Sequence, residues 1–238
     1  MFDPSVTIVT INYNNLIGLK ATIESVIQQN YSNFDYLIVD GESTDGSVEL
    51  INQYDTNLCK ALIEKDIGIY HAMNKAISIA KGEWLIFMNS GDIFTDYCSL
   101  ELAMKDVEAG NEVIFADWIY ATSEKYIKAS KKNMTIRHQS VIYKKSLHDI
   151  YGTYVVSQNV TISDYIFFSS LNQVSWKYHN KPLSICEETG ISSQVKHFQQ
   201  RIAVDFIFGR YSISRLIITF LLHPCYRFLK KIYITLTY

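Results

Sequence analysis

The feature that most constrains the fold is the alternation of short apolar runs with helix-length segments in the first half of the chain. The runs predict strands, and the segments between them carry apolar residues at the three- and four-residue spacing typical of helices. The predicted strands are residues 6–10, 34–39, 58–64, 83–88 and 112–116, and the predicted helices are 16–29, 47–54, 69–80 and 99–109. This rhythm indicates βαβ units, and therefore an α/β fold with a mostly parallel central sheet flanked by helices.

Polar residues follow four of the predicted strands at the point where each one ends. They occupy residues 10–14, 40–45, 64–68 and 89–92. Ligands of open parallel sheets bind beyond the carboxyl ends of the strands, so we expect these four segments to share one edge and one site.

The segment Asn89-Ser90-Gly91-Asp92 follows an apolar run that reads as a central strand. A glycine beside an aspartate permits a tight turn that directs a carboxylate outward, and Mg²⁺ or Mn²⁺ prefers a carboxylate together with phosphate oxygens. An ordinary turn whose side chains bond the backbone fits these residues equally well. Asp40 has the same two interpretations, as a nucleoside-binding carboxylate or as a turn-forming residue.

Several common sites are absent from the sequence. It contains no GxGxxG, GxxxxGK[ST] or GxSxG motif, and its six histidines lack metal-ligand spacing. The four scattered cysteines are typical of reduced thiols in a cytosolic protein. We expect no secretory signal, and the longest apolar run, about ten residues, is shorter than the ~20 residues that span a bilayer.

The formal charge is unevenly distributed. Residues 201–238 contain six basic residues and one acidic residue, for +5, whereas the remainder contains 16 basic and 23 acidic residues, for −7. The segment also holds two apolar runs, which predict an amphipathic helical extension. Such an extension either packs on the core or lies on an anionic membrane surface. The apolar and basic residues that would meet the membrane are Phe208, Leu216, Ile217, Phe220, Leu221, Arg210, Arg215, Arg227, Lys230 and Lys231.

Four stretches carry a resemblance to a known family: TIVTINYN at 7–14, IVDGESTDGS at 38–47, EKDIGIYHAMNKA at 64–76 and AKGEWLIFMNSGD at 80–92. Together they resemble family 2 glycosyltransferases of the GT-A fold, in particular the bacterial enzymes that build exopolysaccharide, capsule and O-antigen. The resemblance continues more weakly at 137–140 and 162–165. It implies a GT-A domain over residues 1–200, with a nucleotide-sugar-binding half (1–120) and an acceptor-binding half (121–200), followed by the basic tail at 201–238.

The resemblance also implies roles for particular residues. Asp92 would be the ligand of a divalent metal, Mn²⁺ or Mg²⁺. Asn89 and Gly91 stand where the family's motif carries further aspartates, so we expect metal binding to be weak until the donor diphosphate arrives. The residues implied in nucleotide-sugar binding are Thr10, Asn12, Asp40, Glu42, Asp66, Asn89, Ser90 and Gly91.

In the second half, Asp164 matches the family's catalytic base, although Ser163 replaces the usual preceding glutamate. A carboxylate there would take the proton of the attacking acceptor hydroxyl. From the residues alone, His138 and Gln139 read as surface residues of a basic segment. The resemblance implies acceptor or diphosphate contacts for them.

The function implied by the resemblance is inverting transfer of a sugar from a nucleotide-sugar, UDP-linked as a first expectation, to a saccharide acceptor. We expect a lipid-linked acceptor, a cytoplasmic location at the inner face of the cell membrane, and no nucleic-acid partner. Two alternatives remain. One is a sugar-phosphate nucleotidyltransferase, which would require a glycine- and lysine-rich N-terminal loop, whereas residues 10–15 contain neither glycine nor lysine. The other is a non-catalytic carbohydrate-binding protein derived from a transferase.

Overall fold

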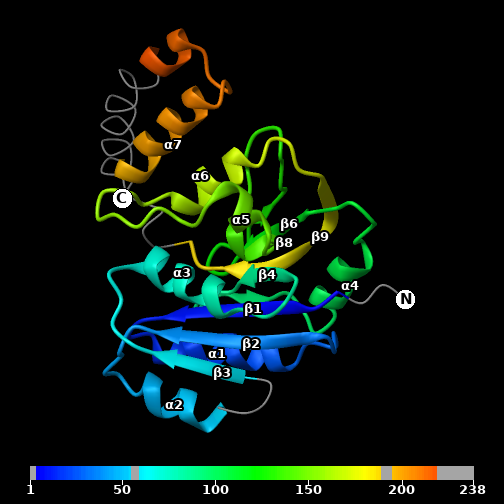
Figure 1. Cartoon of the computed structure of the whole chain (residues 1–238), viewed down its shortest axis with the longest axis vertical. Helices are drawn as coiled ribbons and strands as arrows, with labels where there is room; N and C mark the ends of the chain where they lie inside the picture. The colour runs from blue at the N-terminus through cyan, green and yellow to red at the C-terminus, as the bar shows by residue number, and fades with distance from the viewer. Residues whose placement is uncertain (1–3, 55–58, 189–194, 219–238) are drawn as a thin grey trace.

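The computed structural model describes residues 4–54, 59–188 and 195–218 (Figure 1). Its elements in chain order are β1 (Val6–Asn12), α1 (Leu16–Ile27), β2 (Phe34–Asp40), α2 (Ser47–Tyr54), β3 (Cys59–Ile63), α3 (Ile69–Ile79), β4 (Trp84–Phe87), β5 (Ile93–Phe94), α4 (Ser99–Lys105), β6 (Val113–Tyr120), β7 (Tyr126–Ile127), the 3₁₀ helix η1 (His138–Ser140), β8 (Val141–Lys144), α5 (Leu147–Tyr151), α6 (Ser163–Ser170), β9 (Trp176–Cys186) and α7 (Val195–Ile207).

One sheet runs through the described residues in the order β3-β2-β1-β4-β8-β6-β9-β5, with β7 paired to β6. The first four strands are mutually parallel, as predicted. The second half is mixed, because β8 is antiparallel to both β4 and β6 while β9 is parallel to β6. The α/β class is therefore confirmed, and the antiparallel strands lie in the half where the sequence lacks the βαβ rhythm.

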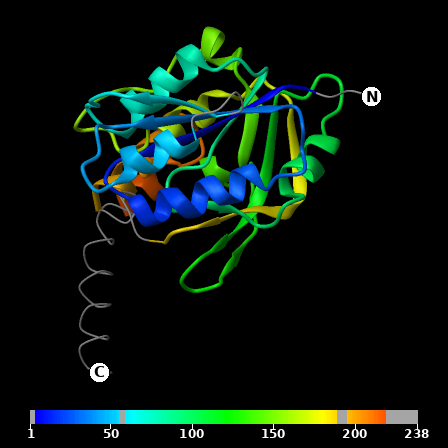
Figure 2. The same ribbon diagram turned by 90° about the horizontal axis from the view of Figure 1, so that it is seen from below.

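Helices cover both faces of the sheet, and two apolar clusters result from the alternation of side chains along the strands. On one face, Val9 and Ile11 of β1 pack with Met73 of α3. On the other, Ile8 of β1 packs with Ile23 of α1. Figure 2 shows α1 (blue) and α3 (cyan) on opposite sides of the strands.

The reversed direction of β8 positions the site. Because β8 is antiparallel to β4, the start of β8 lies at the sheet edge where β4 ends. The residues just before β8 therefore meet those just after β4. This places His138 and Gln139 beside the turn at 89–92, at the carboxyl edge of the parallel strands.

Two predicted boundaries differ from the structure. The helix predicted over 99–109 ends at Lys105, because the chain turns into β6 through Gly110 at φ +93°. The side chain of Asn111 supports this turn by accepting from the Glu108 amide at 2.9 Å. The region 117–200, expected to hold short strands and loops, contains the 11-residue strand β9.

The described part of the tail packs on the domain. Helix α7 begins at Val195, before the predicted apolar run, and buries Ile202 and Val204. Beyond these contacts, six large apolar residues are exposed: Phe206, Ile207, Phe208, Ile213, Ile217 and Ile218. The predicted membrane-facing residues Phe220, Leu221, Arg227, Lys230 and Lys231, and also Cys225, lie outside the described residues. Among residues 4–54, 59–188 and 195–218, no helix is long and apolar enough to cross a membrane.

Candidate active site

The turn after β4 is held in place by helix α1. The hydroxyl of Thr22 donates to the Asp92 carbonyl at 2.8 Å, lies 3.2 Å from the Asn89 carbonyl, and accepts from the Gly91 amide at 3.0 Å. Gly91 has φ +100°, a left-handed conformation that favours glycine. A rigid turn therefore presents Asn89, Ser90 and Asp92 at the sheet edge.

Asp92 is nearly buried and already engaged by the protein. Gln139 donates to its Oδ2 at 2.6 Å, and the Glu187 amide donates to its Oδ1 at 3.1 Å. Burial raises the pKa of Asp92 above its ordinary value, although these donors and the nearby Arg137 and His138 oppose that effect. The carboxylate is thus costly to ionise in the absence of a cation.

The donor set for a divalent cation is small. A carboxylate is chemically suitable for Mn²⁺ or Mg²⁺, and each oxygen of Asp92 keeps a lone pair beside its hydrogen bond. Within the described residues, however, no three His, Cys, Asp or Glu side chains gather into a metal cluster. The residues present fit a cation only if a ligand such as a diphosphate supplies the remaining oxygens.

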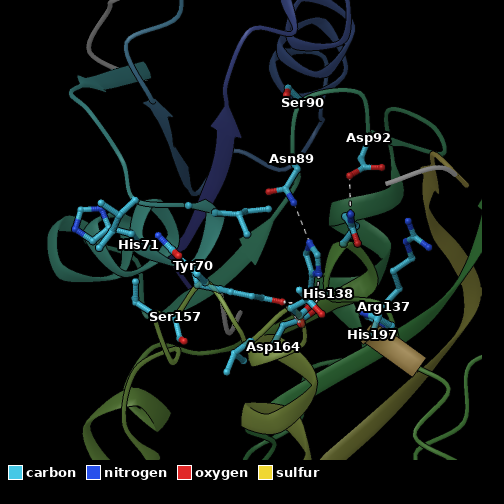
Figure 3. Close-up of a pocket in the computed structure, with 18 of the residues that line it drawn as sticks. Tyr70, His71, Asn89, Ser90, Asp92, Arg137, His138, Ser157, Asp164 and His197 are labelled. Carbon is cyan, nitrogen blue, oxygen red and sulfur yellow. Dashed lines mark hydrogen bonds and ion pairs between the residues drawn. The ribbon is translucent and has the colours of Figure 1, made fainter. Parts of the chain in front are cut away.

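A hydrogen-bonded chain crosses the site from α3 to the turn (Figure 3). The Tyr70 hydroxyl donates to Asp164 Oδ1 at 2.7 Å, and Asp164 Oδ2 meets Nδ1 of His138 at 2.8 Å. At the other side of the ring, Nε2 lies 3.0 Å from Nδ2 of Asn89. Tyrosine, aspartate, histidine and asparagine thus form one continuous network.

The charge in this network resides on Asp164. Burial by itself raises the pKa of this carboxyl, but the hydrogen bond and positive charge of His138, with the Tyr70 hydroxyl, outweigh burial and lower the pKa to about 2. Burial and the same carboxylate raise the pKa of Tyr70, which therefore remains a donor. Asp164 is accordingly an ionised acceptor at neutral pH.

The network borders a cavity of about 360 Å³. Residues from both halves of the chain line it, among them Asn89, Ser90, Asp92, His138, Gln139 and Asp164. Its wall also carries Arg137, Glu187 and His197. Four buried polar atoms of the wall have no hydrogen-bond partner within the described residues: Asn89 Oδ1, Gln139 Oε1, Arg137 Nε and His197 Nδ1. Unsatisfied buried groups are rare in folded proteins, so their concentration here is typical of a ligand site.

The predicted nucleoside residues form a separate cluster at the ends of β1 and β2. Asp40 is fully buried, accepting from Asn12 Nδ2, the Ser43 amide and the Ser43 hydroxyl, each at 2.7 Å. Thr10 is also fully buried, and its hydroxyl donates to the Met88 carbonyl at 2.7 Å. These residues shape the edge of the sheet, and their contact with a ligand stays a prediction.

Two further predicted residues lie nearer the surface. Glu42 is exposed and has φ +62°. Oδ1 of Asp66 lies 2.9 Å from Nδ1 of His71 and 2.9 Å from Nζ of Lys75, within ion-pair distance of both. A Cβ placed at Gly41 would lie 3.0 Å from the Tyr13 ring and 3.7 Å from Asp66 Oδ2, so the loops after β1, β2 and β3 meet there.

Sequence reasoning missed Tyr70, Arg137 and His197 as site residues. Tyr70 lies inside the stretch 64–76 and Arg137 directly precedes His138. Both residues therefore belong to the segments that carry the resemblance, but the sequence assigned neither of them a role. His197 is brought in by α7, from a region without a legible motif. Only the tertiary structure relates these side chains to the turn.

Comparisons with known proteins agree with this architecture. A family model described as "Glycosyl transferase family 2" matches residues 7–175. The chain is 27% identical over 228 residues to a PGL/p-HBAD biosynthesis glycosyltransferase of Mycobacterium bovis, covering 88% of each chain. It is 33% identical over 94 residues to TuaG of Bacillus subtilis, described as a "putative teichuronic acid biosynthesis glycosyltransferase", covering 38% of this chain and 37% of TuaG.

Solved structures share the fold at lower identity. S. aureus TarS (residues 1–349) in complex with UDP-GlcNAc superposes with a TM-score of 0.69 at 16% identity, covering 86% of this chain and 65% of that one. A mannosyltransferase of Pyrobaculum calidifontis in complex with GDP-Man and Mn²⁺ gives a TM-score of 0.67 at 15% identity, covering 89% and 66%. The chain thus spans about two thirds of the length of these two structures.

Proposed function

We propose that this chain, which belongs to glycosyl transferase family 2, catalyses the inverting transfer of a sugar from a UDP-linked nucleotide-sugar to a hydroxyl of a saccharide acceptor. The observation that carries the proposal is the meeting in one cavity of the Asn89–Asp92 turn with His138 and Asp164. The first group lies on the nucleotide-binding half, and the second is contributed by the other half. Such a cavity can hold a donor and an acceptor side by side.

The chain's residues have distinct tasks in this reaction. The loops at Asp40 and Asp66 would hold the nucleoside, with Asn12 and Glu42 beside them. Arg137, with its guanidinium on the cavity wall, would receive negative charge as the diphosphate leaves. The acceptor's proton would pass to the His138–Asp164 pair.

Asp92 would hold a divalent cation, Mn²⁺ or Mg²⁺, together with oxygens of the diphosphate. Such a cation supplies charge neutralisation for the leaving group. Because Asp92 is buried and bonded by Gln139, we expect appreciable metal affinity only when the nucleotide is present. The metal in the Pyrobaculum structure, which also contains GDP-Man, supports this expectation.

The acceptor is proposed to be lipid-linked and the pathway to build a bacterial surface glycoconjugate. The names of the Mycobacterium and Bacillus relatives support this class of product. The exposed apolar residues at 206–218, with the exposed Arg215 among them, support contact of the tail with an anionic membrane at the cytoplasmic face, whereas Arg210 is already paired with Asp205 at 2.6 Å.

A panel of nucleotide-sugars tests the function. UDP-glucose, UDP-galactose, UDP-GlcNAc and GDP-mannose are each incubated with the full chain and Mn²⁺, and release of nucleoside diphosphate is measured. Release from one donor, with a matching increase in melting temperature, is expected. A carbohydrate-binding protein would give the increase without release, and a nucleotidyltransferase would instead produce nucleoside triphosphate when pyrophosphate is added.

A further inference from the structure

A second cavity, of about 330 Å³, lies beside α7. Its walls come from the turn at 131–134, from α7 and from the segment that follows α7. Four basic residues and one acidic residue contribute to them: Lys132, Arg201, Arg210, Arg215 and Asp205. The carboxylate is already occupied, because Asp205 pairs with Arg210 at 2.6 Å and accepts a hydrogen bond from the Tyr165 hydroxyl. The cavity therefore carries an excess of positive charge.

Arg201 is held in a position that leaves most of its donors available. One of its nitrogens donates to the Met134 carbonyl at 2.8 Å, and its guanidinium carbon lies 4.7 Å from the centroid of the Tyr165 ring. A guanidinium has five N–H donors, and the bond to Met134 uses one of them. Neither Arg201 nor the exposed Lys132 forms an ion pair within the described residues.

The positive charge of this cavity has a cost in the unliganded protein. Cations that share one cavity repel one another, and the repulsion is relieved when an anion binds among them. A phosphate group suits this arrangement better than a carboxylate does, because it offers more oxygens to several separate donors. Arginine and lysine bind phosphate through charge-assisted hydrogen bonds, and arginine can do so with two parallel bonds.

Apolar side chains are exposed next to these cations. The guanidinium carbon of Arg210 lies 5.5 Å from the ring centroid of the exposed Phe208. Ile213 and Ile217, on the segment that carries Arg215, are also exposed. In Figure 1 this segment and α7 extend beyond α6, at the opposite end of the molecule from β3. A molecule with a phosphate group and an apolar chain would meet both kinds of side chain.

We propose that this basic cavity binds a phosphate group carried by a lipid, and that it is separate from the site of the donor diphosphate. Arg201 and Lys132 supply donors to the phosphate oxygens, and Arg215 adds positive charge at the same cavity. The apolar chain of the lipid lies along the exposed residues at 206–218. Two lipids present such a group: a phospholipid of the bilayer, and an acceptor whose sugar is joined to its lipid through phosphate.

The fold favours the acceptor as the source of this phosphate. Asp164 lines the active-site cavity, whereas the next residue of α6, Tyr165, lies against Arg201. On α7, His197 lines the active-site cavity and Arg201, four residues later, lines the basic one. Side chains at this spacing have Cβ atoms about 5–6 Å apart, a separation on the scale of one sugar ring. The assignment to the acceptor rests on the proposed function, whereas phosphate binding itself does not.

Calorimetric titration of the full chain with octyl phosphate tests the site, with UDP and Mn²⁺ present to occupy the donor site. R201Q should weaken binding about tenfold, and K132Q, which removes an exposed charge, about threefold. K128Q is the matched control, because Lys128 is equally an exposed lysine but lies outside the cavity. Nonanoate, which has the same chain on a carboxylate, should bind at least tenfold more weakly than octyl phosphate.

Three results would overturn the phosphate site: equal affinity of wild type, R201Q and K132Q, an equal loss in K128Q, or equal binding of nonanoate. Displacement of octyl phosphate by UDP would place it in the donor site, with the same consequence. K132Q should melt no lower than wild type, since it removes repulsion and no packing. If R201Q fails to fold, the comparison of K132Q with K128Q decides.

The source of the phosphate is tested with two phosphodiesters. One is a set of octyl phosphates that carry glucose, galactose or N-acetylglucosamine, and the other is dihexanoyl phosphatidylglycerol. An acceptor site predicts that one sugar phosphate binds at least tenfold more tightly than the phospholipid, and that D164N removes this advantage. Equal binding that D164N does not change would assign the cavity to a bilayer phospholipid and refute the acceptor assignment. Absence of nucleoside diphosphate release from every donor would refute the proposed function, while the octyl phosphate titrations still decide the phosphate site.

Discussion

Replacing Tyr70 by phenylalanine removes a single oxygen from the network of the site. The lost hydroxyl donates to Asp164 at 2.7 Å and lies 3.2 Å from the Thr161 carbonyl. Phenylalanine keeps the ring, including its contact with Tyr154 at a centroid distance of 5.7 Å. The change therefore removes a hydrogen bond to a partly buried charge while leaving the packing nearly intact.

The size of the effect follows from Asp164. Lowering its pKa from 3.8 to about 2 against the effect of burial corresponds to roughly 2 kcal/mol in favour of the folded, ionised state. Tyr70 and His138 share this contribution, and a hydrogen bond to a charged group is worth about 1.5–3 kcal/mol. Because Tyr70 supplies only part of it, we expect Y70F to lose about 1–2 kcal/mol at neutral pH, or about 2–8 °C in melting temperature for a domain of this size.

The pH dependence separates this cause from a general loss of packing. Because the folded-state pKa of Asp164 lies below its unfolded value, its contribution is complete above about pH 4 and disappears as the pH falls through about 2. The difference between wild type and Y70F should decrease over the same interval. Urea unfolding at several pH values measures it, with Y97F, which removes an exposed hydroxyl, as the control. A loss that persists unchanged in acid, or no loss at neutral pH, would refute the reasoning.

Three further variants test other parts of the structure. D92N should melt at or above wild type at neutral pH, since the raised pKa of Asp92 means that stability falls as its carboxyl ionises. A half-turn of Gln139 lets its Oε1, unpartnered within the described residues, meet the new amide. Calorimetry should show that D92N has lost Mn²⁺-dependent nucleotide affinity. G82A should cost about 1–3 kcal/mol in urea unfolding, because a Cβ there would lie 2.4 Å from the backbone nitrogen of Thr7. D40N should destabilise the fold by about 2 kcal/mol or more, measured in the same way, and reduce nucleotide-sugar binding in a thermal-shift assay.

The first half of the fold was predictable because its periodicity is strong. β1 and β4 are buried along their whole lengths. The residues of β4 are all apolar and those of β1 are mostly β-branched, and the helices between them show one apolar stripe. The directions of β8 and β9 carry no comparable signal. A strand of four residues such as β8 reads the same whether it runs parallel or antiparallel, and its direction is decided by the sheet that it joins.

The site was predictable in part for the same reason. The position of Asp92 follows from the end of a buried strand. The resemblance implied separate roles for His138 and Asp164, and their pairing is visible only in the structure. The donor role of Tyr70 follows from the geometry of α3 against α6, which is tertiary information. No local pattern distinguishes Tyr70 from the other 16 of the chain's 17 tyrosines.

The topology that joins the two halves has a consequence for when activity can arise. The bonds that complete the cavity link residues 94, 49 and 47 positions apart: Tyr70 to Asp164, Asn89 to His138, and Asp92 to Gln139. Chains emerge from the ribosome amino end first and can begin to fold there. A nascent chain that ends before His138 can therefore form the parallel strands and their nucleotide loops while it lacks the group that would activate an acceptor or water. If those loops hold the nucleoside as proposed, donor binding by a truncated product would not measure its capacity for transfer.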